Sequence, residues 1–223
     1  MKKGLLKEAL IKYCAGIILV ALLLFLPAGT LKWRNGWLFM ALLFIPMCVA
    51  GILMYVKAPD LLRSRLNAKE KQSEQKDVIS YSGIMFVAAF VAAGLNHRYG
   101  WITMPDVFVV IGAVVFLLSY AGFGEVLREN AFLSRTIEVK EDQTVVDTGL
   151  YGIVRHPMYT ASVFLFLSMP LILNSLISFL IMLVYIPLIV KRIRNEEEVL
   201  EKELKGYREY KEKIRYRLIP YIW

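Results

Sequence analysis

The sequence predicts an all-α integral membrane protein with about five to six transmembrane helices, the last two forming a helical hairpin. The chain of 223 residues is 57% hydrophobic with a mean hydropathy of +0.53, which is rare for a soluble domain of this size. Its charged residues are clustered and leave five long uncharged stretches. Its basic residues are distributed asymmetrically between alternate connections, as the positive-inside rule expects of a membrane protein.

The first four uncharged stretches are each long enough for one transmembrane helix. About twenty apolar residues cross the hydrocarbon core, and we expect helices over roughly 13–31, 36–56, 78–96 and 106–123. The first helix follows several lysines, as a secretory signal peptide does. The sequence LPAGTLKW that follows it is a poor cleavage site, so an uncleaved first span is the preferred interpretation.

The fifth uncharged stretch, between Arg155 and Lys191, is too long for one helix. Pro170, the pair Asn174-Ser175 and Pro187 interrupt it, which predicts helices over roughly 158–170 and 175–190 joined by a tight turn. The sequence leaves open whether they cross the bilayer fully or form a re-entrant hairpin. We expect the last helix to continue through KRIRNEEEVLEKEL until Gly206, followed by a basic, aromatic C-terminal tail that suits a membrane surface.

The asymmetry of basic residues predicts six crossings with both termini in the cytoplasm. Of the 27 lysines and arginines, 24 then lie on the cytoplasmic side and three, Lys32, Arg34 and Arg98, on the other. A basic face beside anionic lipid explains the net charge of +8 and argues against a nucleic-acid partner. The membrane is the inner membrane in a bacterium or the endoplasmic reticulum in a eukaryote. Cys14 and Cys48 show no spacing typical of a metal site.

We interpret the chain as a single membrane domain, 1–223, with an N-terminal four-helix part (1–124) and a C-terminal part (125–223) that carries the candidate site. The charged loop 57–77 is either an interfacial helix that covers a site or a solvated connector. The polar segment 125–155 contains two strand-like pieces, TIEVK and QTVVD. The Thr148-Gly149 pair after them signals a turn that either presents backbone N–H groups to a ligand or redirects the chain.

Two charged clusters flank the hairpin. The first, Arg155-His156-Pro157, opens a helix, since proline suits the first helical turn; its structural alternative is an arginine on lipid phosphate and a capping histidine. In the second cluster, Arg192 and Glu196 are four residues apart and share a helix face. The topology brings both clusters to one membrane boundary, where ionisable groups are candidates for function.

These clusters carry a family resemblance. GLYGIVRHPMY, followed by a hydrophobic helix pair and RIRNEEEVL…GYREY, resembles the isoprenylcysteine carboxyl methyltransferase family of integral membrane methyltransferases over residues 143–223. The resemblance implies S-adenosylmethionine as methyl donor, with S-adenosylhomocysteine as product, in a small cytoplasmic cofactor-binding segment. It implies that Arg192 is catalytic and faces the substrate carboxylate. The cofactor-binding residues that it implies are Gln143, Thr144, Val145, Val146, Tyr151, Arg155, His156, Pro157, Met158 and Glu196.

The chemistry of these residue types is consistent with the implied roles. A glutamate suits the cationic groups of S-adenosylmethionine, and Arg155 or His156 suits its carboxylate. A carboxylate acceptor is already ionised at neutral pH, so positioning can supply most of the catalysis. An amine or thiol acceptor would need a base, for which His156 or Glu197 is a candidate. We expect a lipidic or small-molecule acceptor that enters between the helices from the lipid bilayer.

Two other functions remain open from the sequence. The tail YRLIPYIW and the R-H-P-x-Y element also resemble NADPH-dependent membrane sterol reductases. GFGEVL does not complete the soluble dinucleotide-binding fingerprint, which such membrane enzymes do not need. A non-enzymatic membrane protein is the other alternative, although few ionisable groups in the spans leave a transporter little to work with. The sequence does not predict an oligomeric state.

Overall fold

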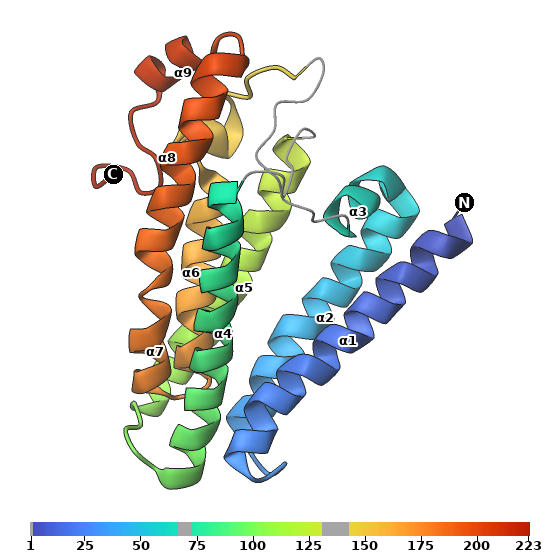
Figure 1. Ribbon diagram of the computed structural model, residues 1–223, viewed down its shortest axis with the longest axis vertical. Helices are drawn as coiled ribbons and strands as arrows, with labels where there is room; N and C mark the ends of the chain where they lie inside the picture. The colour runs from blue at the N-terminus through green and yellow to red at the C-terminus, as the bar shows by residue number, and fades with distance from the viewer. Residues whose placement is uncertain (1, 67–72, 131–142) are drawn as a thin grey trace.

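The computed structural model describes residues 2–66, 73–130 and 143–223, and every regular element in these ranges is a helix. Four long helices run through the N-terminal part: α1 (Lys2–Ala28), α2 (Arg34–Lys57), α4 (Ser73–Tyr99) and α5 (Asp106–Glu129). The short helices α3 (Pro59–Leu66), η1 (Gly149–Gly152) and α9 (Tyr207–Lys213) lie toward one end of the bundle, together with the N-terminus (Figure 1). We call this the polar end.

The predicted all-α membrane architecture is confirmed. Five helical segments within the described ranges are long and apolar enough to cross a membrane, and a shorter apolar helix, α6 (Pro157–Ile172), accompanies them. Most boundaries lie within a few residues of the expected ones, but α1 begins at Lys2 rather than near residue 13. Lysine and glutamate are good helix formers, so the charged N-terminal tail continues the helix instead of preceding it.

The predicted hairpin is present, with one interruption in its second arm. After α6 come α7 (Leu176–Met182) and α8 (Tyr185–Glu203), rather than one helix over 175–190. Pro187 explains the break, because its nitrogen cannot donate to the carbonyl of Leu183 and its ring crowds that carbonyl. Beyond it α8 continues as expected to Glu203, and Gly206, with φ of 85°, separates it from α9.

The turn of the hairpin reaches the end of the bundle opposite the polar end. Asn174 adopts a left-handed φ of 56°, and the Ser175 hydroxyl accepts a hydrogen bond from the Ser178 amide. The Asn174 side chain accepts from Met104 N in the α4–α5 connection, and buried Asn96 of α4 accepts from Ile102 N. Because the turn lies beside this connection, the hairpin extends through the full depth of the bundle.

The strand-like segment QTVVD is not a strand, and TIEVK (136–140) lies outside the described residues. Residues 143–147 have no regular secondary structure, because Val145 packs against the cluster formed by Leu204, Tyr207 and Tyr210 instead of pairing with another strand. The turn predicted at Thr148-Gly149 is present and becomes η1. Within loop 57–77, residues Pro59–Leu66 form the helix α3; whether that helix covers a site stays a prediction.

Helices α5 and α6 pack closely at Gly112. A Cβ atom added there would lie 2.8 Å from Leu171 Cβ and 3.0 Å from Ile172 N, closer than packed atoms allow. Small residues at such positions let helix backbones approach in membrane proteins. A Cβ atom added at Gly124, on the same helix, would meet no neighbouring atom within 4 Å.

We predict that Gly112→Ala lowers the free energy of unfolding by about 1–3 kcal/mol, because the added methyl group forces α5 and α6 apart. Gly124→Ala serves as the matched control and should leave stability unchanged or slightly higher, since alanine favours the helix. Thermal unfolding in detergent measures both variants. Equal stability of the two variants would contradict the close packing.

Candidate functional site

The two charged clusters of the sequence come together at the polar end. The segment from η1 into α6 carries Arg155 and His156, and α8 carries Arg192, Glu196 and Glu197. These two parts of the chain lie side by side in Figure 1, and hydrogen bonds join them directly. The site therefore depends on long-range packing between α6 and α8.

A buried carboxylate, Glu197, is the centre of the first interaction network. It is 3% exposed. Arg155 Nε donates to its Oε1 at 2.8 Å, and His156 Nε2 lies 3.2 Å from the same oxygen. Arg217 of the C-terminal tail donates from Nε to Oε2 at 2.9 Å. A buried charge is tolerated only when it is paired and hydrogen-bonded, and both oxygens of Glu197 are.

The C-terminal tail is fastened to the same place through the backbone. Arg155 Nη1 donates to the carbonyl oxygens of Ile214 and Arg215, at 2.7 Å and 2.9 Å. The backbone amides of Arg155 and His156 donate to the carbonyls of Tyr216 and Arg217, both at 2.9 Å. The Arg155 guanidinium thus holds three segments together: the start of α6, α8 and the tail.

The second network adjoins the first and includes Tyr159, which lies in the first turn of α6. Its hydroxyl donates to Glu196 Oε2 at 2.5 Å and accepts from Arg192 Nε at 3.0 Å. The imidazole of His156 stacks on the Tyr159 ring with a centroid distance of 5.7 Å. Tyr159 therefore sets the positions of the two α8 residues that the sequence singles out, Arg192 and Glu196.

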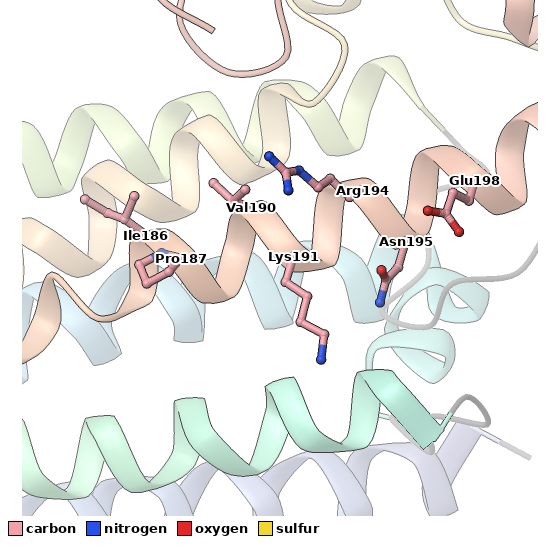
Figure 2. A pocket seen from close by; sticks show the side chains of 7 residues that line it. All are labelled: Ile186, Pro187, Val190, Lys191, Arg194, Asn195 and Glu198. Carbon is pink, nitrogen blue, oxygen red and sulfur yellow. The ribbon is translucent and has the colours of Figure 1, made fainter.

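The charged run of α8 is divided among three faces of the helix. Glu197 points into the core, in phase with buried Ile189 and Ile193. Arg192 and Glu196 face Tyr159. Lys191, Arg194, Asn195 and Glu198 line a separate outer groove of about 570 Å³ with three apolar residues, as Figure 2 shows. Neighbours in the sequence therefore belong to different environments.

A cavity of about 420 Å³, which we call the inner cavity, opens beside the second network. Arg192 and Tyr159 line it from α8 and α6, and Arg65 lines it from α3. Hydroxyl groups of Ser82, Ser162 and Tyr185 and the rings of Phe86, Phe123 and Phe166 form much of the remaining wall. The arrangement places two arginine side chains next to an apolar chamber, whereas the serine hydroxyls in its wall already donate to the carbonyls of Val78 and Tyr159.

The remaining predicted site residues lie around the end of α8. Tyr151 is buried; its hydroxyl accepts from Asn130 and its carbonyl oxygen accepts from the Tyr210 hydroxyl at 2.8 Å. Burial raises the pKa of Tyr151 to about 12, so the phenol stays neutral. Residues 143–146 pass beside this group, with Val145 packed near the α8–α9 junction. The Glu129 carboxylate accepts from the Leu150 amide, where it leaves no room for a Cβ at Gly149, whose φ is 56°.

The structure brings Arg155, His156, Pro157, Met158, Arg192 and Glu196 to one place. Val145 and Tyr151 pack around the α8–α9 junction next to it, and Gln143, Thr144 and Val146 are the chain neighbours of Val145. Sequence reasoning missed Tyr159 as the link between the clusters, Arg217 as a partner of Glu197, and Arg65. A helix-phase argument would have found the buried position of Glu197, which follows Ile189 and Ile193 at intervals of four residues. The contact of Arg217 has no comparable local signal.

Fold and site together define an integral membrane protein with an ion-paired polar site at one end of its helical bundle. Residues 107–202 match the model of the isoprenylcysteine carboxyl methyltransferase (ICMT) family. The structure of the eukaryotic intramembrane Ras methyltransferase ICMT (isoprenylcysteine carboxyl methyltransferase) aligns with a TM-score of 0.57 over 94% of this chain and 75% of that chain, at 18% sequence identity. This alignment shows a common fold. The family match concerns residues 107–202, which are less than half of the chain, and within them it includes both charged clusters of the site.

A second similarity concerns a shorter segment. The Delta(14)-sterol reductase TM7SF2 of Mus musculus is 32% identical over 91 residues, which are 40% of this chain. The aligned segment spans 22% of the length of that reductase. The similarity to the reductase is therefore limited to part of each chain.

We predict that Glu197→Gln lowers the free energy of unfolding by about 3 kcal/mol, because it leaves Arg155 buried without its counter-charge. The matched control is Glu198→Gln, which alters the neighbouring exposed residue and should change stability by less than about 0.5 kcal/mol. Thermal unfolding in detergent measures both. Equal effects of the two substitutions would contradict a structural role for the Glu197 network.

Proposed function

We propose that the protein is an integral membrane methyltransferase that uses S-adenosylmethionine and methylates a carboxylate on a lipidic or membrane-delivered acceptor. The observation that carries the proposal is the Arg192–Tyr159–Glu196 network beside the inner cavity, in a segment that matches the ICMT family. Bound S-adenosylmethionine would supply an activated methyl group, which an ionised carboxylate can accept without a general base.

The residues at the polar end fit this cofactor. Glu196 offers a carboxylate to its cationic groups. The buried Tyr207 hydroxyl has no hydrogen-bond partner among the described residues. Burial, together with the negative charges of Glu197 and Glu196, raises the pKa of Tyr207 well above its usual range. A buried polar group without a partner costs about 1–3 kcal/mol, so a ligand group that bonds to it would be favoured. Residues 143–146 and Tyr151 complete the proposed cofactor site.

Roles within the proposed site follow from the contacts. Arg192, oriented through its bond to Tyr159, would hold the acceptor carboxylate. Arg155 and His156 engage Glu197, so we assign them to positioning the site rather than to direct contact with the acceptor. Positioning is an effective source of catalysis when the nucleophile needs no deprotonation.

The proposed site is cytoplasmic. The N-terminus, α3, η1 and α9 lie toward the same end of the bundle (Figure 1). The connections with most of the 27 basic residues lie at that end as well, which supports a cytoplasmic location under the positive-inside rule. A water-soluble donor and a bilayer-borne acceptor would then meet at the inner membrane surface.

A NADPH-dependent lipid reductase is the second candidate, favoured by the partial similarity to the sterol reductase. Thermal unfolding of the detergent-solubilised protein with each ligand separates the two. S-adenosylhomocysteine at 100 times its dissociation constant should stabilise the protein by about 2.7 kcal/mol, and NADPH should not. Stabilisation by NADPH alone would overturn the methyltransferase proposal.

The proposed roles predict different effects of two α8 substitutions. Arg192→Lys should lower kcat at least tenfold and leave S-adenosylhomocysteine affinity within about twofold, because lysine lacks the planar fork that matches a carboxylate. Glu196→Ala should abolish cofactor binding. The controls are Arg194→Lys and Glu198→Ala on the outer groove. Transfer of a tritiated methyl group to N-acetyl-S-farnesylcysteine and isothermal titration with S-adenosylhomocysteine measure these effects; full activity of Arg192→Lys would refute its assigned role.

A further inference from the structure

The outer groove of α8 lies across the boundary between the apolar and the charged part of this helix. No residue from Leu176 to Val190 is charged, and Lys191 opens the charged part. Ile186, Pro187 and Val190 line the apolar side of the groove, and its polar side begins with Lys191. Because a membrane-spanning helix holds its apolar residues at the depth of the hydrocarbon, the groove runs from the hydrocarbon into the head-group layer.

The groove belongs to the outward face of α8. Ile189 and Ile193, on the inward face, are buried in the core of the bundle. In contrast, Ile186, Lys191 and Arg194 are exposed. A lipid molecule beside the protein therefore reaches the groove without displacing a helix.

Two cationic side chains, Lys191 and Arg194, stand at the head-group level of the groove. They are three residues apart on one helix, which places their Cβ atoms about 5–6 Å from each other. Figure 2 shows these long side chains extending to either side of the groove, so a phosphate group between them is within reach of both. Neither forms an ion pair with a residue in the described ranges, and this includes Glu198 in the same groove.

The position of Glu198 limits the depth at which the groove attracts an anion. Glu198 follows Arg194 by four residues, which is about 6 Å along the helix axis, on the side away from the apolar part. An anion at the level of Glu198 is repelled, whereas one at the level of Lys191 and Arg194 is attracted. The favoured level is the one next to the apolar part of the groove.

We propose that the outer groove binds one anionic phospholipid, with its phosphate between Lys191 and Arg194 and an acyl chain along the apolar part. Basic residues at a membrane boundary attract anionic head groups, and the apolar residues one turn earlier offer a surface to the chain. A zwitterionic lipid presents the same phosphate together with a cancelling positive charge, so it is attracted less. The groove lies on a face of α8 other than the one with Arg192 and Glu196, and this inference does not depend on the proposed enzymatic activity.

The test measures the binding of two lipids that differ only in the head group, dioleoyl phosphatidylglycerol and dioleoyl phosphatidylcholine. Native mass spectrometry of the detergent-solubilised full chain gives both dissociation constants. The wild-type protein should bind the anionic lipid more tightly. Replacing both cations, by Lys191→Gln together with Arg194→Gln, should lower this preference by at least about tenfold. The exchange of Lys191→Arg and Arg194→Lys keeps both charges and should keep the preference.

The matched control is Lys202→Gln together with Lys205→Gln, which removes the same charge from two other exposed residues. Lys202 follows Arg194 by eight residues, about 12 Å further along α8 and away from the apolar part, so this variant should keep the preference. Because all four side chains are exposed, thermal unfolding without added lipid should be the same for every variant.

Three lipid-binding results would overturn the inference: equal affinity of the wild type for both lipids, an unchanged preference after removal of Lys191 and Arg194, or an equal loss in the control variant. A fourth contrary result is a change of oligomeric state with unchanged lipid binding in the variant without the two cations. The groove would then be a contact between two copies of the chain rather than a lipid site.

Discussion

The pairing of the buried Glu197 carboxylate with Arg155, His156 and Arg217 is the interaction on which the polar end of the molecule depends. It joins the start of α6, the C-terminal half of α8 and the tail after α9. Hydrophobic packing between helices is weakly directional in a membrane, because lipid tails are as apolar as the side chains. A buried ion-paired group instead fixes the register of α6 against α8, since every alternative leaves a charge without a partner.

The candidate site follows from that register. With Glu197 directed into the core, the preceding Glu196 and Arg192, which lies one turn earlier, face Tyr159. The hairpin turn at Asn174 and Ser175 aligns the other end of the same helices. The residue that stabilises the fold, Glu197, and the residues with proposed functional roles, Arg192 and Glu196, therefore lie close together on one helix. The inner cavity lies where this ordered surface meets α3, α4 and α5.

Much of the fold was predictable from the sequence because membrane crossing imposes a length and an apolar composition on each helix. The break between α7 and α8 also has a local cause, Pro187, although the sequence analysis expects one continuous helix over 175–190. The convergence of Arg155 and Glu196 followed from topology. The contacts of Tyr159 and Arg217 were not predictable, because they depend on the rotation of α6 against α8 and on the path of the tail. The inward orientation of Arg65 was likewise not predictable, because it depends on α3 being a helix that buries Leu62.

The central claim is that two distant segments form one cofactor site at the polar end. Ultraviolet cross-linking of tritiated S-adenosylmethionine, followed by peptide mapping, tests it most directly. The account predicts labelled peptides from 143–159 and from 192–210, with labelling abolished by excess S-adenosylhomocysteine. Labelling confined to the opposite end of the bundle, or insensitive to that competitor, would contradict it.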